Sequence, residues 1–449
     1  MTKDSTRRSF VGAATAAVAS RVCGANDRIN VGIVGVGGRG GDHLRVYSQL
    51  PGARVVGVCD VSQAARERAQ AMLLKNTGEK AREFEDMREV YADSKVDAVS
   101  IATPNHWHAL AAIWAMKVGK DVYAEKPASY DIAEGLKMVE VARDSKRMLQ
   151  IGSQHRSNPF KIRGMAALRG GLIGDIYHVR GLCFKRRRSI GSKPDTPVPP
   201  GVNWDLFRGP APMRPFNELR FKYNWHWFWD TGNGEIGNTG VHEMGIARWA
   251  MGDPEWPKAV HSHGGKFVYK DDQETPNTMT SSFDFGDREL VFEIRGLPTG
   301  AEAVVSKTKG GWRPSPSATS PQAGAPPLNV MIGNIFLGSE GWAAMSDEGF
   351  QAFKGDSDEL VMQEYPDKKP ENDPTSLHIQ NFLSVCRSRN DMDLHDGIGI
   401  ANMSAAMCHL ANISYRVGRG LKLQAGPKFV NDPAATQLLS RTYRKPYML

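Results

Sequence analysis

Cysteine is scarce and long apolar runs are absent, and each absence excludes a class of protein. Five cysteines among 449 residues show no C-x-x-C or metal-ligand spacing, and they are too few for a disulfide framework. No apolar run approaches the roughly 20 residues that span a bilayer. The net charge of +8 comes without the clustered, aromatic-interleaved basic surface of a nucleic-acid-binding protein. We therefore expect a soluble globular protein with no metal site, no membrane span and no nucleic-acid partner.

The first 26 residues differ from the rest of the chain. They place Arg7 and Arg8 before a weakly apolar stretch of Ala, Val and Gly, and a small-residue cleavage site follows at Ala19. A charged start, a short apolar core and such a site describe a signal peptide, and the adjacent arginines resemble a twin-arginine export signal. Residues 1–26 are therefore predicted to direct the protein to the periplasm or otherwise out of the cytoplasm. If they form only a basic tail, the protein stays in the cytoplasm.

Residues 27–153 alternate short apolar runs with helical patterns. Near-continuous apolar runs are typical of parallel strands buried on both faces, and they occur at 29–35, 53–60, 96–104, 121–124 and 148–152. Helical spacing occupies the intervals 62–76, 106–119 and 131–145. Strand and helix alternating in this way predict an α/β fold, with a Rossmann domain built on a doubly wound parallel sheet.

The turn after the first strand points to a dinucleotide. Gly35, Gly37 and Gly40 form G-x-G-x-x-G between a strand and a helix, where glycine permits a tight turn and close approach of a pyrophosphate to the helix N-terminus. Gly38 and Arg39 lie inside this turn. Asp60 follows 20 residues later at the end of the second strand. A carboxylate there binds the adenosine ribose and disfavours a 2′-phosphate, which predicts NAD rather than NADP.

Polar residues also end the next two strands. Thr103, Asn105 and His108 belong to a T-P-N-x-x-H segment, and the strand 121–124 delivers Glu125 and Lys126 just before a proline. The carboxyl ends of parallel strands share one edge of the sheet, so these residues are expected beside the glycine turn.

These motifs, in this order, resemble the Gfo/Idh/MocA family of NAD(P)-dependent oxidoreductases. The resemblance covers nearly everything after the signal and implies a second α+β domain, residues 154–449, with an open-faced mixed sheet whose face covers the nicotinamide end of the cofactor. It also implies a homo-oligomer formed through that sheet and a carbohydrate or polyol substrate. The cofactor-binding set that follows is Gly35, Gly37, Gly38, Arg39, Gly40, Asp60, Thr103, Asn105, His108, Glu125 and Lys126.

The helical stretch within 233–252 supplies the second half of the expected site. It places Asn238 and His242 four residues apart, on one face of a helix. In the family an aspartate and a histidine with this spacing meet the substrate beside the E-K-P lysine. Lys126 and His242 match that pattern and are the predicted catalytic residues, with Asn238 and His242 as substrate ligands. The aspartate position holds Asn238, which cannot carry a negative charge, so a Lys–Asp–His proton relay is in doubt.

The chemistry expected of these residues is alcohol oxidation. A histidine titrates near neutral pH and suits removal of a hydroxyl proton, and a lysine beside it stabilises the developing alkoxide. The aromatic run 223–230 either stacks on a sugar ring or packs in the core, and His226 within it is a weaker catalytic candidate than His242. A low-complexity segment, 308–329, is expected to be an insertion.

Three functions fit the sequence. The first is NAD-dependent hydride transfer at a hydroxyl carbon of a sugar, an inositol-like polyol or a glycoside. The second is glycoside hydrolysis through transient oxidation by a bound, recycled NAD. The third is non-catalytic NAD binding, against which the presence of both Lys126 and His242 argues. The sequence leaves open the particular substrate and the oligomeric state.

Overall fold

The computed structural model describes residues 28–300, 302–303, 328–355 and 359–449. The predicted signal peptide and nearly all of the low-complexity segment 308–329 lie outside these ranges, so both remain predictions. No helix in the described part of the chain is long and apolar enough to cross a membrane.

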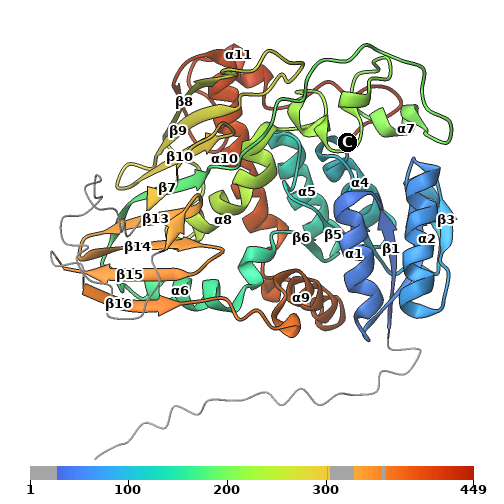
Figure 1. Cartoon of the computed structure of the whole chain (residues 1–449), viewed down its shortest axis with the longest axis horizontal. Coiled ribbons are helices and arrows are strands. Elements are labelled where there is room, and N and C mark those ends of the chain that lie inside the picture. Colours follow the sequence, from blue (N-terminus) through green and yellow to red (C-terminus); the bar gives the residue numbers. More distant parts are fainter. Residues whose placement is uncertain (1–27, 301, 304–327, 356–358) are drawn as a thin grey trace, which may run out of the picture.

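The first domain is the predicted Rossmann fold (Figure 1). Its six parallel strands follow the order β3-β2-β1-β4-β5-β6. The strands are β1 (Ile29–Val34), β2 (Ala53–Cys59), β3 (Arg82–Phe84), β4 (Ala98–Ile101), β5 (Asp121–Ala124) and β6 (Leu149–Ile151). The helices are α1 (Gly38–Gln49), α2 (Gln63–Thr77), α3 (Met87–Ala92), α4 (Asn105–Lys117) and α5 (Ile132–Ser145). Strand order reverses at β1, and a crevice opens there at the carboxyl ends of β1 and β4.

The second domain is built on a mixed nine-stranded sheet of order β16-β15-β14-β13-β7-β10-β9-β8-β17, in which only β7 and β10 run parallel. Its strands are β7 (Ile176–Cys183), β8 (Ala259–Gly265), β9 (Thr278–Asp284), β10 (Glu289–Arg295), β13 (Ile332–Gly338), β14 (Gly341–Ser346), β15 (Phe350–Lys354), β16 (Glu359–Glu364) and β17 (Leu421–Lys422). A separate pair joins β11 (Glu302–Ala303) to β12 (Asn329–Val330). The predicted fold class is confirmed.

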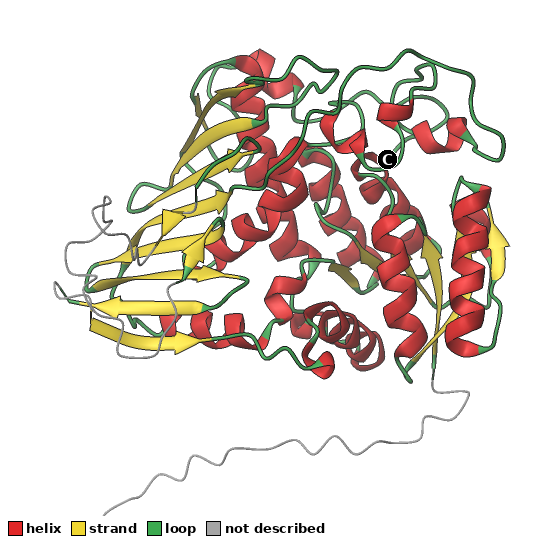
Figure 2. Ribbon diagram, viewed as in Figure 1, coloured by secondary structure: helices red, strands yellow, loops and turns green. Residues whose placement is uncertain are grey.

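One expectation about this sheet is wrong. Helices, and not the bare sheet face, lie between the sheet and the Rossmann domain (Figure 2). They are α6 (Pro159–Arg169), α8 (Val241–Ala250) and α10 (Ile398–Val417), and α10 contacts both β8 and α5. The physical reason is that this face carries large apolar side chains, among them Val179, Phe292 and Phe336, which are fully buried in one core with the helices and require an apolar partner.

The domain boundary predicted at residue 153 does not hold for all of the chain, because later segments pack into the first domain. Helix α9 (Pro374–Ser388) packs against α1 and β5, and Ile379 and Phe382 belong to the Rossmann core. A short helix, α11 (Pro433–Gln437), follows near the end. Residues 374–388 therefore complete the first domain although the sequence assigned them to the second.

Residues 196–227, which we call the strap, also return to the Rossmann domain. The strap contains α7 (Trp204–Arg208), η3 (Glu218–Arg220) and η4 (Asn224–Trp227). Near the end of β2, the Gln63 amide donates to the Gly201 carbonyl at 2.8 Å and the Asn203 amide to the Val61 carbonyl at 2.9 Å. Near the start of α4, the Trp107 indole donates to the Leu206 carbonyl at 3.0 Å. The strap is thus hydrogen-bonded on both sides of the crevice.

Candidate active site

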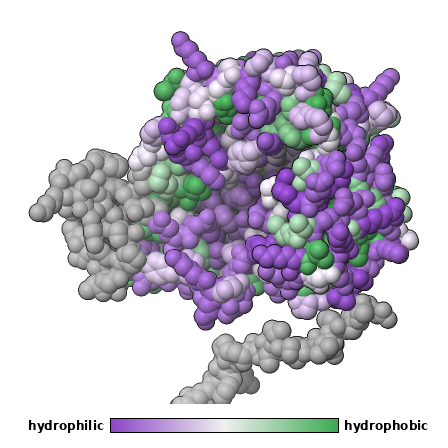
Figure 3. All heavy atoms as spheres, turned by 45° about the vertical axis from the view of Figure 1, so that its right-hand side comes forward, coloured by the Kyte–Doolittle hydropathy of each residue, from purple (hydrophilic) through white to green (hydrophobic). Residues whose placement is uncertain are grey.

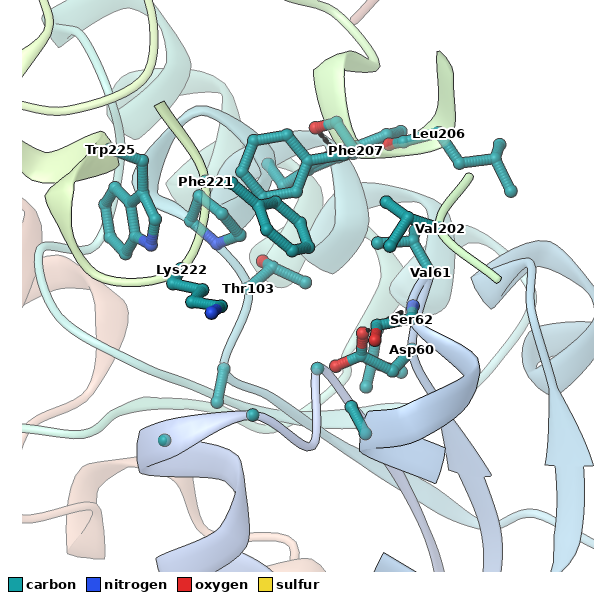
Figure 4. Close-up of a pocket in the computed structure, with 18 of the residues that line it drawn as sticks. Asp60, Val61, Ser62, Thr103, Val202, Leu206, Phe207, Phe221, Lys222 and Trp225 are labelled. Carbon is teal, nitrogen blue, oxygen red and sulfur yellow. Dashed lines mark hydrogen bonds between the residues drawn. The ribbon is translucent and has the colours of Figure 1, made fainter. Parts of the chain in front are cut away.

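A cavity of about 960 Å³ lies between the carboxyl edge of the Rossmann sheet and the strap. The molecule is hollowed between its two domains, and hydrophilic residues line the hollow (Figure 3). In the close-up, Asp60 and Ser62 face the cavity from the Rossmann side, while Phe207, Phe221 and Trp225 face it from the strap (Figure 4). One continuous space therefore joins the glycine turn to the ends of β4 and β5.

The glycine turn has the shape that a pyrophosphate requires. Gly35 adopts a φ of +79°, in the left-handed region that favours glycine. Gly37 and Gly38 line the cavity, and a Cβ placed on either would meet nothing within 4 Å. Helix α1 begins at Gly38 with no side-chain cap at its N-terminus, so its first amides remain available to an anion. These residues fit the dinucleotide that the sequence predicts.

Asp60, the predicted ribose ligand, is held in place by two backbone amides. Its two carboxylate oxygens accept hydrogen bonds from the amides of Val36 and Ser62, each at 2.9 Å, and further acceptor capacity faces the cavity. Burial raises the pKa of Asp60, and the two amides oppose that rise. Arg68 lines the same end of the cavity. Sequence reasoning missed Arg68, which supplies a positive charge on the helix after Asp60.

We expect Asp60→Ala to relax cofactor choice without abolishing binding. The carboxylate repels a 2′-phosphate, and with it removed Arg68 would attract one, so the ratio of NADP to NAD dissociation constants should fall about tenfold or more, equivalent to about 1.4 kcal/mol. Calorimetric titration of both dinucleotides measures this ratio. Asp144→Ala, an exposed carboxylate on α5, is the control. Equal or tighter binding of NADP by the unmodified protein would contradict the assignment.

Glu125 anchors a buried network under the cavity. Its Oε1 accepts from Arg39 Nε at 2.8 Å and lies 2.9 Å from His43 Nε2, and His43 Nδ1 lies 2.9 Å from Ser100 Oγ. Burial alone would raise the pKa of Glu125, but the Arg39 charge and the His43 contact bring it well below its usual value. Arg39 is therefore engaged with Glu125. His43 was missed; its only signal was the four-residue spacing from Arg39.

The T-P-N-x-x-H segment joins neighbouring elements. His108 has its ring nitrogens 2.8 Å from the Thr103 carbonyl and 2.7 Å from the Pro127 carbonyl, so it ties the two strand-end turns together. Asn105 donates to Asn233 of the second domain at 2.9 Å. Thr103, Asn105 and His108 all line the cavity, and their contact with a cofactor stays a prediction.

Lys126 meets the second domain at Asn238. The Lys126 ammonium lies 2.8 Å from the Asn238 carbonyl and 3.5 Å from its side-chain oxygen. The two residues line the same cavity. Burial lowers the pKa of Lys126, and Glu125 partly offsets that shift. A cation with few charge partners is thus held at the expected reaction centre.

The helix carrying Asn238 departs from the uniform helix that was expected. Residues Ile236–Gly240 form a π-helical turn, η5, ahead of α8, and such turns occur frequently at functional sites. The Asn238 amide nitrogen donates to the Tyr223 hydroxyl at 2.9 Å. Asn238 therefore links Lys126 to the strap.

His242 has a different environment from the one expected. Its ring stacks on His155 with centroids 4.6 Å apart, its Nδ1 is buried with no partner among the described residues, and it is not among the residues that line the cavity. Burial lowers the pKa of His242 well below its usual value, and the charges of His155 and Lys126 lower it further. The structure thus brings Lys126 and Asn238 into contact, and leaves the catalytic role of His242 as a prediction.

Comparisons with known proteins agree with this architecture. Residues 29–153 match the model of an oxidoreductase family, NAD-binding Rossmann fold, and residues 177–267 match an oxidoreductase family, C-terminal alpha/beta domain. The WlbA dehydrogenase from Bordetella pertussis, solved in complex with NADH and UDP-GlcNAcA, has a TM-score of 0.62, is 19% identical and covers 88% of this chain and 99% of its own. At that identity the likeness shows the shared fold.

Two curated relatives show the range of activities among similar proteins. Inositol 2-dehydrogenase 1 of Saccharopolyspora erythraea is 37% identical over 150 residues, which are 33% of this chain and 43% of that protein. Glycosyl hydrolase family 109 protein 1 of Akkermansia muciniphila is 26% identical over 178 residues, which are 37% of each. The chain thus spans less than half the length of either relative.

Proposed function

Because this chain carries both domains of the Gfo/Idh/MocA oxidoreductase family, we propose that it transfers a hydride between NAD and a hydroxyl-bearing carbon of a sugar, an inositol-like polyol or a glycoside. The observation that carries this proposal is the meeting of Lys126 and Asn238 in the cavity that also contains the glycine turn. One residue comes from each domain, so the site forms only where the domains meet.

The residues divide the chemistry between them. NAD, when bound, supplies the hydride acceptor. The alcohol carbon loses a hydride, its oxygen loses a proton, and a carbonyl remains. Lys126 binds the oxygen as negative charge develops, in a partly dry site where such a contact is strong. Asn238 orients that oxygen through its side-chain amide. The neutral imidazole of a histidine, either His242 or His226, accepts the proton.

A panel of substrates tests the proposal. The purified protein is incubated with NAD and with inositols, free sugars or glycosides, and NADH absorbance and product release are followed together. NADH accumulating with a polyol or sugar supports net oxidation. If the protein binds NADH but oxidises no member of the panel and cleaves no glycoside, the proposed function fails.

Redox-neutral glycoside hydrolysis is the second candidate, and the strap favours it. Because the strap is hydrogen-bonded on both sides of the crevice, a bound dinucleotide would be slow to exchange. A cofactor that stays bound suits a reaction that oxidises the sugar and later reduces it again. Glycoside cleavage without NADH accumulation would select this candidate over net oxidation.

We also propose that the protein is exported, on the basis of Arg7 and Arg8 before a weakly apolar stretch. Replacing both arginines with lysine is expected to leave the protein in the cytoplasm with its signal uncleaved, because the arginine pair is the feature that twin-arginine export recognises. Fractionation and mass measurement check this. Unchanged export of the double variant would refute it.

A further inference from the structure

The strap brings a second histidine, His226, to the proposed reaction centre. His226 lies in η4 and lines the same cavity as Lys126 and Asn238. Its ring is fixed between two aromatic neighbours: the Trp225 centroid is 3.5 Å away and nearly parallel, and the Tyr223 centroid is 4.5 Å away. Only 8% of the residue is exposed. The ring is therefore held by its aromatic neighbours while His226 lines the cavity where a substrate would bind.

The hydrogen bonding of His226 determines which nitrogen is free. Nδ1 lies 2.6 Å from the Tyr223 carbonyl oxygen, and a carbonyl only accepts, so Nδ1 carries the hydrogen. In the neutral ring Nε2 then has a free lone pair. Nε2 makes no hydrogen bond to a described residue and is not among the fully enclosed unpartnered atoms, so it opens on the cavity.

The surroundings of His226 keep it neutral. Burial lowers the pKa of His226 well below its usual value; the Tyr223 carbonyl opposes this, and the positive charge of Lys126, followed by Arg187 and His108, lowers it further. A neutral imidazole with an accessible Nε2 is a proton acceptor near neutral pH.

We propose that His226 is a catalytic residue, and that its Nε2 accepts the proton of the substrate hydroxyl whose oxygen Lys126 binds. In this step the O–H bond breaks, an N–H bond forms on Nε2, and the hydride leaves the carbon for NAD. This rests on the proposed oxidoreductase function. His242 stacks on His155 and does not line the cavity, so it has no part in this step.

The variant His226→Asn separates catalysis from structure. The asparagine amide can still donate to the Tyr223 carbonyl in place of Nδ1, but it supplies no base. With a substrate identified from the panel, kcat is expected to fall about 10²-fold or more, with KM and NADH affinity within several-fold. The wild-type decline in kcat at low pH, as Nε2 takes a proton, should disappear from the residual activity of the variant.

The controls are His242→Asn and His261→Asn, the latter an exposed position on β8. His261→Asn should match the wild type. If kcat falls about 10²-fold in His242→Asn while kcat of His226→Asn stays within several-fold of the wild type, the proposal is overturned and the base is His242. If kcat falls about 10²-fold in both single variants, and the double variant has a kcat no lower than either single variant, the two rings act as one unit that includes His226. That result supports the proposal.

A readout that needs no turnover completes the test. Diethyl pyrocarbonate acylates an accessible neutral imidazole nitrogen, and peptide mass mapping locates the product. We expect modification of His226 in the protein alone and protection by NADH together with a bound polyol. Absence of modification would show that Nε2 does not open on the cavity and would overturn the proposal. Modification and protection in a protein that oxidises nothing would instead mean that the proposed function has failed.

Discussion

Replacing Lys126 with alanine is expected to lower kcat on the order of 10²–10³-fold while the dissociation constant for NADH stays within several-fold. The ammonium is partly buried and lies 2.8 Å from the Asn238 carbonyl oxygen. Its loss would leave a developing alkoxide without a cation. Loss of one such contact in other enzymes costs roughly 3–4 kcal/mol of barrier. We expect the glycine turn to bind the pyrophosphate independently of Lys126, so cofactor affinity should persist.

Two further variants make the Lys126 prediction specific. Lys126→Met preserves most of the side-chain volume and should lose as much activity as alanine if the charge is what matters. Lys137→Ala, on α5 and paired with Glu140, removes a lysine from the same domain and should have no effect on turnover. Thermal unfolding and NADH titration verify that each variant is folded. A Lys126→Ala variant that retains kcat within fivefold would exclude Lys126 from the chemical step.

Gly40→Ala is expected to have the largest effect on the cofactor site itself. A Cβ at Gly40 would lie against the Gly35 carbonyl, closer than any van der Waals contact allows, and backbone cannot rotate away as a side chain can. Overpacking costs about 1–3 kcal/mol even where side chains can yield. We therefore expect the unfolding free energy to fall by about 3 kcal/mol and NADH affinity to fall about 100-fold or more.

The neighbouring Gly41→Ala provides a matched control. Gly41 lies in the same helix α1, and a Cβ there would meet nothing within 4 Å. This variant should be at least as stable as the wild type, because alanine favours a helix over glycine, and it should bind NADH normally. Denaturant unfolding and fluorescence titration measure both quantities. If Gly40→Ala and Gly41→Ala bind NADH equally well, close packing at the third glycine is not what shapes the site.

The first domain could be predicted because its determinants are local. Its strands are short apolar runs, and its motifs stand at fixed distances from the strand ends, so Gly35, Asp60, Glu125 and Lys126 had to share one edge of a parallel sheet. The structure confirms that sheet. Even here His43 was missed, because a buried histidine that pairs with Glu125 is recognised only once α1 packs on β5.

The second half of the site could not be predicted in the same way. His226 was ranked below His242 because the family resemblance assigns a catalytic histidine to position 242, whereas the path of the strap was not visible in the sequence. A strap position depends on hydrogen bonds such as that from Asn203 to Val61, more than 100 residues away in the chain. Similarly, nothing local indicated that α9 completes the Rossmann core or that helices cover the inner face of the second sheet.

The sequence by itself thus determined the parallel sheet, the glycine turn, Asp60 and the lysine at the strand edge. All of these follow from hydrophobic periodicity and from residues close together in the chain. Only the tertiary structure decided that Lys126 binds the Asn238 carbonyl and that the strap covers the crevice. It also decided that His226, and not His242, lines the cavity. Those features are contacts between segments far apart in the chain, and their geometry arises only when the two domains bury their apolar surfaces against each other.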